Sequence, residues 1–390
     1  MTALWQAFRA EFRRLRGNPI AMAAMVGAVV LYGVFYPQPY LNEAIKNVPV
    51  IVVDQDNSAS SRELIRRIDA GEGAVVAATA NDLPAAREAF FARRVYAIVV
   101  VPPYFERDLL AGRQSPIAAF GDGGYFLIYR QAMAAVSGAA QSLGVQVETR
   151  RLVAAGTDPA AARALVDPMP TTLVPLFNPQ GGYASYIVPA AFVMLLQQTL
   201  LMGIGALRGG TRGPAPPEDA AAGPVGGVFG PALCYVTIFT VWMMLYLVLL
   251  AYVYHLPRLG ALGDMLGLGL PFLLATSFLG LTLAYLMPSR ESVVLLLVGL
   301  GMPLLFISGI SWPTEAIPAG LEMIGRLIPS SSAIPALVRV NQMGATLAQV
   351  RHEWLTLLAL ALLYGTTAVL AHRWRTGRIR STIRPVAGTP

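Results

Sequence analysis

Residues 230–254 read GPALCYVTIFTVWMMLYLVLLAYVY, a stretch without Asp, Glu, Lys or Arg. A helix rises 1.5 Å per residue, so about 20 apolar residues cross a hydrocarbon core about 30 Å thick. A charged side chain at mid-membrane would cost about 2.5–3.5 kcal/mol on insertion, and none is present to oppose it. The stretch therefore predicts a transmembrane helix.

Five further stretches meet the same criteria. They run from Ile20 to Tyr36, Ala184 to Leu207, Met265 to Met287, Val293 to Ile310 and Leu355 to Ala371. The whole chain of 390 residues is 55% hydrophobic and 13% charged, with a mean hydropathy of +0.56, whereas soluble domains carry about 25% charged residues. The sequence predicts an α-helical polytopic membrane protein with six transmembrane helices. Because no small-x-small cleavage site follows the first stretch, we interpret it as an uncleaved anchor.

The arginines indicate how the chain crosses the bilayer. The net charge of +7 comes from 29 basic and 22 acidic residues. The residues before the first span carry four arginines and one glutamate, and those after the sixth carry five arginines and no acid. The positive-inside rule places both tails in the cytoplasm, as an even number of spans requires. Because topology explains the basic excess, we expect no nucleic-acid partner.

The N-terminal segment, residues 1–19, has the pattern of a basic amphipathic helix. Its aromatic and aliphatic side chains recur every three or four residues, and its arginines lie on other faces: Trp5, Phe8, Phe12 and Leu15, against Arg9, Arg13 and Arg16. Such a helix lies in the cytoplasmic interface of a membrane. Two interpretations stay open: a topology anchor, or a helix that also contacts a cytoplasmic partner.

The remaining domain boundaries follow from the spans. We expect the first transmembrane helix at 20–39, an α/β extracytoplasmic domain inserted between the first and second spans at 40–183, a five-helix transmembrane region at 184–372, and a basic cytoplasmic tail at 373–390. Inside the α/β domain, strands are predicted at 48–53, 74–78, 96–101 and 117–120, and helices at 62–69, 83–93, 104–110 and 128–154. Alternation of strands and helices indicates this fold class, and Ser60 with Glu63 has capping-box spacing.

The sequence offers little for catalysis. Asp54 and Asp56 follow a strand, as in transferases that hold a metal-bound nucleotide sugar, but a polar turn explains them equally simply, and we favour the turn. The one lysine, Lys46, does not follow glycine, so no P-loop is present. A single cysteine, Cys234, cannot form a disulfide framework or a cysteine-rich metal site. We predict no catalytic, cofactor-binding or metal-binding residues.

A few polar side chains lie inside the apolar stretches. They are Gln197, Gln198, Thr276, Ser277 and Ser308. They could line a substrate path, although glutamines in membrane helices serve more often as hydrogen-bonded links between helices. Because no ionisable residue lies within the spans, ion coupling has no visible carrier. If the protein moves a substrate, the energy should come from another polypeptide.

The order of these parts and three sequence segments resemble a known family. The segments are Ser308-Gly309 followed by Trp312-Pro313, then Leu327-Ile328-Pro329-Ser330 and Gly344-Ala345 before the last span, and the stretch from Val53 to Leu64. Together they resemble the permease subunit of bacterial type-2 ABC exporters. The stretch from Val53 to Leu64 also resembles the start of the external domain in the subgroup that has a large periplasmic domain and is often encoded beside a periplasmic adaptor protein.

The resemblance implies a non-enzymatic subunit of an ATP-driven exporter in the bacterial inner membrane, moving a hydrophobic or amphipathic substrate outward. ATP and Mg would bind to a partner ATPase, and no cofactor to this chain. Further expected partners are the lipid bilayer, a second permease copy or homologue, and an adaptor protein. Residues 312–350 would re-enter the outer leaflet, and the outer gate would comprise Ser308, Gly309, Trp312, Pro313 and Pro329.

The expected ATPase-docking residues depart from the family pattern. Members often carry a charged cytoplasmic helix after the second span, whereas this chain continues from Arg208 to Arg212 into a flexible Pro/Gly/Ala loop at 213–224. The candidates for docking are Arg13, Arg16, Arg208, Thr211, Arg212, Arg290 and Glu291. Two rival hypotheses remain: a membrane-anchored receptor or scaffold with a ligand-binding periplasmic domain, and a membrane-embedded transferase using Asp54 and Asp56.

Overall fold

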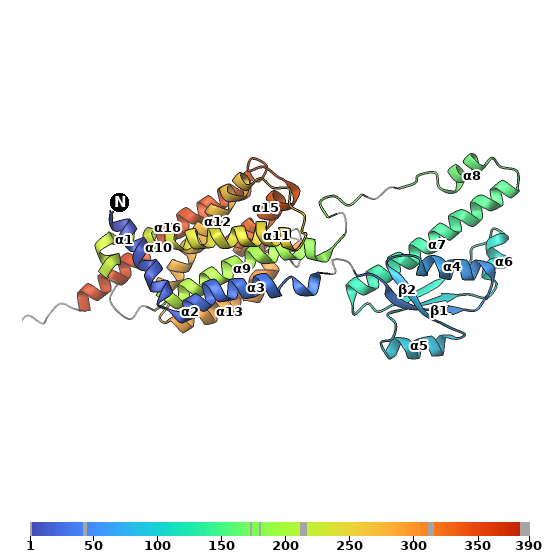
Figure 1. Ribbon diagram of the computed structural model, residues 1–390, viewed down its shortest axis with the longest axis horizontal. Helices are drawn as coiled ribbons and strands as arrows, with labels where there is room; N and C mark the ends of the chain where they lie inside the picture. The colour runs from blue at the N-terminus through green and yellow to red at the C-terminus, as the bar shows by residue number, and fades with distance from the viewer. Residues whose placement is uncertain are drawn as a thin grey trace, which may run out of the picture. The chain divides into compact units, whose positions relative to one another are not determined.

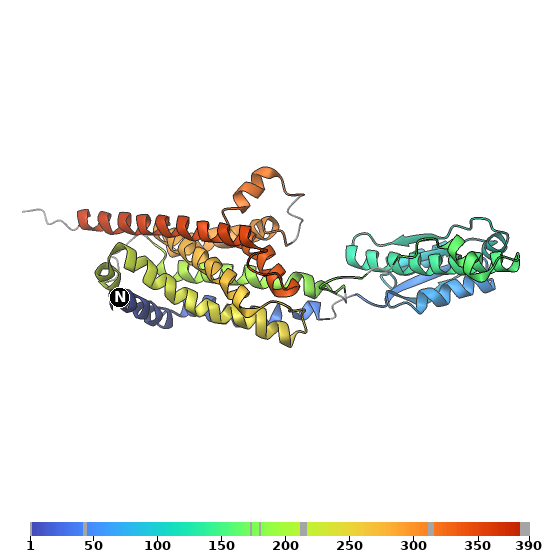
Figure 2. The ribbon, with the colours of Figure 1, turned by 90° about the horizontal axis from the view of Figure 1, so that it is seen from above.

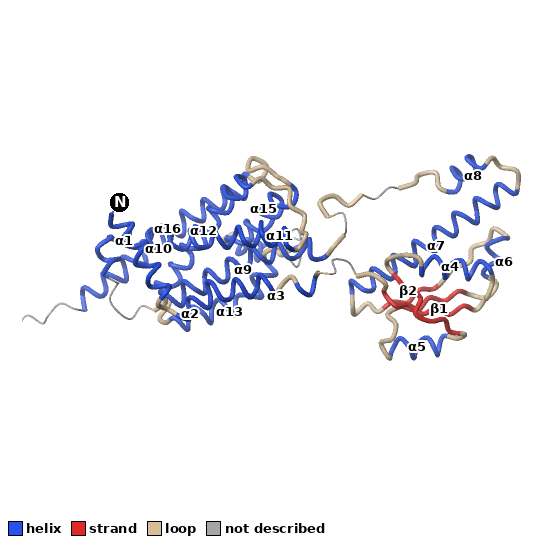
Figure 3. Tube along the Cα trace, in the orientation of Figure 1, coloured by secondary structure: helices blue, strands red, loops and turns tan. Residues whose placement is uncertain are grey.

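The computed structural model describes residues 2–41, 45–171, 174–178, 181–210, 217–310 and 316–382. The chain divides into two compact units. The helical unit comprises Met1–Glu43 and Pro175–Pro390, and the sheet unit comprises Ala44–Val174. Figure 1 shows the elements of each unit, and all strands that the structure describes belong to the sheet unit (Figure 3).

The helical unit contains six helical segments that are long and apolar enough to cross a membrane. These segments are Pro19–Tyr40, Tyr183–Arg208, Ala221–Val253, Leu262–Leu286, Arg290–Ile307 and Arg351–Arg375. The elements of the unit are α1 (Thr2–Arg16), α2 (Pro19–Met22), the π-turn η1 (Ala23–Gly27), α3 (Ala28–Phe35), η2 (Gln38–Tyr40), α9 (Tyr183–Arg208), α10 (Pro217–Met244), the π-turn η3 (Leu245–Leu249), α11 (Leu250–Val253), α12 (Leu262–Leu286), α13 (Arg290–Ile307), α14 (Ala319–Gly325), α15 (Pro329–Met343) and α16 (Arg351–Thr382). The structure thus has the six apolar helices that the sequence predicts.

Helix α12 lies at the centre of the helical unit. It packs against α9, α10, α15 and α16, and α16, red in Figure 2, runs along it. Small residues permit close contacts elsewhere in the unit. A Cβ added at Gly203 in α9 would lie 2.2 Å from Cγ of Met25 in η1, so the first span and α9 touch through a glycine. Helix α1 packs along α10 in the same way, through Gly230.

One connection differs from the sequence prediction. The loop predicted as flexible at 213–224 is helical from Pro217 onward, with a break at Gly223, whose φ is +72°. Proline is tolerated in the first turn of a helix, which explains the start, and glycine adopts the positive φ without strain. After the fifth span, α15 runs from Pro329 to Met343 with Pro335 in its interior.

The sheet unit is an α/β structure. Its elements are β1 (Val48–Asp54), α4 (Ala59–Asp69), β2 (Ala74–Ala80), α5 (Leu83–Phe91), β3 (Ala97–Val101), α6 (Phe105–Leu110), β4 (Ala118–Gly121), α7 (Phe126–Ala154) and α8 (Pro159–Val166). The strand order is β2-β1-β3-β4, in which β1 runs parallel to β2 and β3, and β4 is antiparallel to β3. Helices α4 and α7 cover one face and α5 the other (Figure 1), so β1 is buried on both sides.

The start of α4 corrects one sequence prediction. The capping box is formed by Ser58 and Ser61, each side chain accepting from the backbone N–H of the other, and not by Ser60 and Glu63. Glu63 instead accepts hydrogen bonds from Arg66 and Arg67 one turn onward. The helix therefore begins at Ala59 and not at Arg62. The hydroxyl of Ser61 occupies position N3, where a capping box usually has a Glu carboxylate.

The packing of α1 on α10 predicts the effect of adding one methyl group. A Cβ at Gly230 would lie 2.6 Å from Cβ of Ala7 and 3.1 Å from the Leu4 carbonyl oxygen. Overpacking of this kind typically costs about 1–3 kcal/mol, so we expect Gly230→Ala to lower the thermal unfolding temperature of the purified protein in detergent. Gly299→Ala in α13 is the matched control, because nothing lies within 4 Å of its added methyl group. Equal unfolding temperatures for the two variants would contradict the α1–α10 contact.

Candidate functional site

The acidic turn after β1 is held together by its own side chains. Oδ1 of Asp54 accepts hydrogen bonds from the backbone N–H groups of Asp56 and Asn57, at 3.1 and 3.0 Å, and Oδ2 accepts from the Ser61 hydroxyl at 2.7 Å. Oδ2 of Asp56 accepts from the backbone N–H of Glu106. Partial burial opposes ionisation of Asp56, but this bond and others from its surroundings prevail and lower its pKa. The carboxylates therefore stabilise the turn between β1 and α4, and Asp56 also binds this turn to the start of α6.

This turn does not assemble a metal site in the described part of the chain. Among the residues that the structure describes, no three His, Cys, Asp or Glu side chains gather closely enough to hold a metal ion. The acidic turn thus shows the local hydrogen bonding expected for a polar strand-to-helix connection.

Gln197 lies in a fully buried link between α9 and α15. Its Nε2 donates to Oγ of Ser330 at 2.9 Å, and its Oε1 accepts from the backbone N–H of Ser330 at 2.8 Å. Gln342, near the other end of α15, donates to the carbonyl oxygen of Ser185. Two side-chain links, one near each end of α15, therefore hold this helix on α9.

Three other polar atoms predicted along the spans are buried without a partner. Oε1 of Gln198, Oγ1 of Thr276 and Oγ of Ser277 find no hydrogen bond among the described residues. Gln198 faces α13, because a Cβ at Gly301 would lie 3.6 Å from its Nε2. Buried polar atoms normally find partners, so these three atoms, like Nε1 of Trp242 in the third span, are exceptions among the described residues.

The predicted gate residues end α13 and begin α15. Ser308 caps α13 and donates to the Leu305 carbonyl oxygen at 2.7 Å, Gly309 has a φ of +80°, and Pro329 is the first residue of α15. The hydroxyl of Tyr186 in α9 donates to the carbonyl oxygen of Ile310 at 2.7 Å, which ties this turn to α9. Trp312 and Pro313 lie outside the described residues.

A buried ion pair joins α1 to the end of α9. The Arg208 guanidinium donates through Nε to Oε1 of Glu11 at 2.7 Å and through a second nitrogen to Oε2. Glu11 is fully buried and Arg208 is 7% exposed. Desolvation opposes ionisation of Glu11, but the charge and hydrogen bonds of Arg208, with help from Arg14, outweigh it and hold the pKa of Glu11 below its ordinary value. The carboxylate is therefore charged and bidentately paired.

Further side chains extend this pair across the bundle. The hydroxyl of Tyr235 in α10 donates to Glu11, Nη1 of Arg208 donates to the hydroxyl of Tyr285 in α12 at 3.1 Å, and Arg14 donates to Glu11 at 2.6 Å. From α16, Arg375 lies over the Tyr285 ring and donates to the Arg208 carbonyl oxygen. We call Glu11, Arg14, Arg208, Tyr235 and Tyr285 the Glu11 cluster. It connects α1, α9, α10 and α12 at one end of the bundle (Figure 1).

The docking candidates fall into separate groups. Arg13 and Arg16 are exposed on α1, whereas Arg208 is buried in the Glu11 cluster. Arg290 and Glu291 are exposed at the start of α13, where a Cβ at Gly209 would lie 2.9 Å from Cα of Arg290, so this turn touches the end of α9. Thr211 and Arg212 lie outside the described residues.

Sequence reasoning missed the central role of Glu11. The signal was present, because Glu11 is the one acid among the arginines that precede the first span. Its partner is 197 residues away, however, and the sequence predicts a role in ATPase docking for that partner, Arg208. Tyr235 and Tyr285 looked like ordinary members of apolar stretches.

Comparison with known proteins identifies the family. The sequence model of a family described as "ABC-2 family transporter protein" matches residues 19–207 and 226–370. The chain belongs to the ABC-2 transporter family. Membership makes it a multi-pass membrane permease component of an ABC transporter and implies a partner ATPase. The ABC-2 match covers the sheet unit and all or most of each of the six apolar segments. No curated protein gives a significant match to the chain.

The Glu11–Arg208 pair predicts a large effect of neutralising one partner. Removing one charge of a buried pair leaves the other uncompensated, which typically costs about 3–5 kcal/mol. We expect Glu11→Gln to lower the free energy of unfolding by this amount, measured by denaturant unfolding in mixed micelles. The double variant Glu11→Gln, Arg208→Met should recover much of the loss, because no fully buried charge remains and Arg14 is partly exposed.

Glu322→Gln supplies the control for this measurement. Glu322 pairs with Arg326 on the exposed surface of α14 at 2.8 Å, and such pairs contribute about 0–1 kcal/mol. If Glu11→Gln cost no more than this control, the buried pair would not have the structural role assigned to it.

Proposed function

We propose that this ABC-2 permease is the membrane subunit of an ATP-driven exporter in the bacterial inner membrane. Two copies, or one copy and a homologous chain, form the path. A separate cytoplasmic ATPase binds ATP and Mg, and its closure moves a hydrophobic or amphipathic substrate outward. The receptor or scaffold alternative gains no support from the family match.

The Glu11 cluster is the observation that carries this proposal. A force applied to α1 by an ATPase reaches α9, α10 and α12 directly, because Glu11 and its partners connect all four helices through buried, charge-assisted hydrogen bonds. Breaking any of these bonds without replacement is costly in a dry environment. The cluster therefore suits a rigid joint through which movement of α1 becomes movement of the spans.

The exposed side of α1 suits the docking of a partner. A groove of about 900 Å³ there is lined by aromatic and basic side chains that include Trp5, Phe12 and Arg13. Trp5 and Phe8 stack with ring centroids 4.9 Å apart, and Arg9 lies over the Trp5 ring. Exposed aromatic and arginine side chains are enriched at the centres of protein interfaces. We place the ATPase on this surface and on the turn at Arg290 and Glu291.

The sheet unit would act on the opposite side of the membrane. In the proposed topology it lies in the periplasm, where it covers the exit or passes substrate to an adaptor protein. Its acidic turn is satisfied by local hydrogen bonds, so we assign it no catalytic part.

Reconstitution with a cognate ABC ATPase tests the proposal. We expect the pair to co-purify, and the permease in liposomes to stimulate ATP hydrolysis and support export. Arg13→Glu with Arg16→Glu should abolish co-purification by reversing the charge of the docking surface, whereas Arg326→Glu, on exposed α14, should not. A complex that shows neither stimulated hydrolysis nor export would overturn the proposed function.

Cysteine labelling tests the orientation. The native Cys234 is buried, so Cys234→Ser provides a background for single cysteines at Gln6, Glu88 and Ala387. We expect a membrane-impermeant maleimide added to spheroplasts to label only the cysteine at Glu88, in the sheet unit. The cysteines at Gln6 and Ala387 should react only after lysis. Labelling of either from outside would contradict the cytoplasmic placement of the termini.

A further inference from the structure

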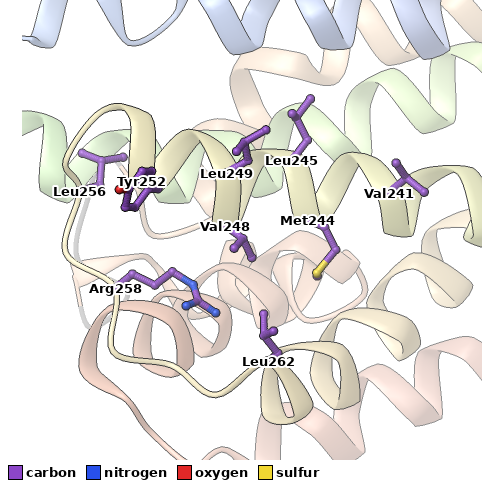
Figure 4. Close-up of a pocket in the computed structure, with 9 residues that line it drawn as sticks. All are labelled: Val241, Met244, Leu245, Val248, Leu249, Tyr252, Leu256, Arg258 and Leu262. Carbon is purple, nitrogen blue, oxygen red and sulfur yellow. The ribbon is translucent and has the colours of Figure 1, made fainter.

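An apolar groove runs along the end of the third span that lies away from α1. One wall is the stretch of α10, η3 and α11 from Val241 to Tyr252, and the other is formed by Leu256, Arg258 and Leu262 (Figure 4). We call it the Arg258 groove. Its volume is about 780 Å³, within the range of small-molecule and lipid sites. Several of its side chains are exposed, among them Val241, Leu249 and Tyr252, so the groove opens to the surroundings of the helical unit.

Arg258 is the one charged residue in the lining of this groove. Figure 4 shows its side chain extending from the loop after α11 into the space between Val248 and Leu262. Its Nε and Nη2 are buried and have no hydrogen-bond partner in the part of the chain that the structure describes. Arg258 as a whole is half-buried, but donor nitrogens that are buried without an acceptor are unfavourable. The geometry therefore calls for an anionic group at this end of the groove.

Asn341 of α15 holds both walls of the groove. Its Nδ2 donates to the carbonyl oxygen of Leu247 at 3.1 Å, inside the π-turn η3, where the regular helical bonding is altered. Its backbone carbonyl oxygen accepts hydrogen bonds from the backbone N–H groups of Leu259 and Gly260, at 2.8 and 3.0 Å. Because Leu259 directly follows Arg258, the loop that carries the guanidinium is fixed. The groove is thus formed in advance, and π-turns are frequent at functional sites.

The length of the groove matches one leaflet of a bilayer. Val241 and Tyr252 are eleven residues apart, which corresponds to about 16 Å along a helix. Half of a hydrocarbon core is about 15 Å. Arg258 lies in the loop that follows the span, at the level of the headgroups, beside Tyr252, whose ring type favours the membrane interface. An acyl chain can therefore lie along the helical wall while its headgroup meets Arg258.

We propose that the Arg258 groove binds one anionic phospholipid of the surrounding bilayer, with its phosphate on the Arg258 guanidinium and an acyl chain along Val241 to Tyr252. This inference needs the membrane embedding of the helical unit, but it does not depend on the ATPase partner or on the direction of transport. Charge complementarity selects an anionic over a zwitterionic lipid, because a zwitterionic headgroup brings its own cation to the site.

The test compares lipid binding by full-length variants purified in detergent and stripped of lipid. We expect the wild type to retain phosphatidylglycerol in native mass spectrometry and to gain thermal stability from it, with little response to phosphatidylcholine. Arg258→Met should weaken phosphatidylglycerol binding about tenfold or more, because a charge-assisted bond is lost. Leu249→Trp should also weaken it, by filling the acyl wall without changing charge. Arg326→Met, on the exposed surface of α14, should bind as the wild type does.

Thermal unfolding separates this role from a purely structural one. Without lipid, Arg258→Met should unfold at the same temperature as the wild type or higher, since the variant removes two buried donor nitrogens that have no partner among the described residues. Adding phosphatidylglycerol should reverse the order. Equal binding of the two lipids, unchanged binding by Arg258→Met, or stabilisation by a transported amphiphile but not by phosphatidylglycerol would each overturn the assignment.

Discussion

The pairing of Glu11 with Arg208 is the constraint on which the helical unit depends. A fully buried carboxylate and a nearly buried guanidinium can both stay charged only while they are paired, since desolvation of a lone ion costs several kcal/mol. Helix α1 therefore cannot leave the end of α9 without exposing or stranding a charge. The two tyrosines add donors and acceptors from α10 and α12, so the position of α1 and the positions of three spans are set together.

A second set of polar links acts at the other end of the bundle through α15. Ser330 is bonded to Gln197 of α9, Gln342 to Ser185 of α9, and Asn341 to the π-turn in the third span. Each such bond between membrane helices contributes only about 0.6 kcal/mol on average. Their main effect is to fix the position of α15. This helix cannot shift without moving both α9 and the wall of the Arg258 groove. The spans are thus held by a strong charged joint at one end and by weaker, more easily exchanged links at the other.

The parts predictable from sequence are those with a local physical signature. Lipid burial requires a continuous apolar stretch, so all six spans are visible in composition alone. The four predicted strands also lie within two residues of the observed ones, the first of them through its β-branched run. The Glu11 cluster has no local signature, because Arg208 and Glu11 meet only through tertiary packing. The same holds for Arg258, which looks like an ordinary loop arginine, and for the π-turns η1 and η3. The capping residues of α4 were misassigned because Ser58 and Ser60 offer equivalent hydroxyls two residues apart.

The contacts between the two ends of the helical unit suggest how movement of the helices is linked to lipid binding in a permease. Movement that enters through α1 reaches α9 at Arg208, and α9 carries both Gln197 and Ser185 to α15. Helix α15 in turn holds Leu247 and the loop of Arg258 through Asn341. The chain of contacts is continuous, but its last links are single neutral hydrogen bonds, which break at lower cost than the charged joint. A shift of α9 would therefore alter the Arg258 groove before it disrupted the Glu11 cluster, and lipid in that groove would favour whichever arrangement keeps its walls together.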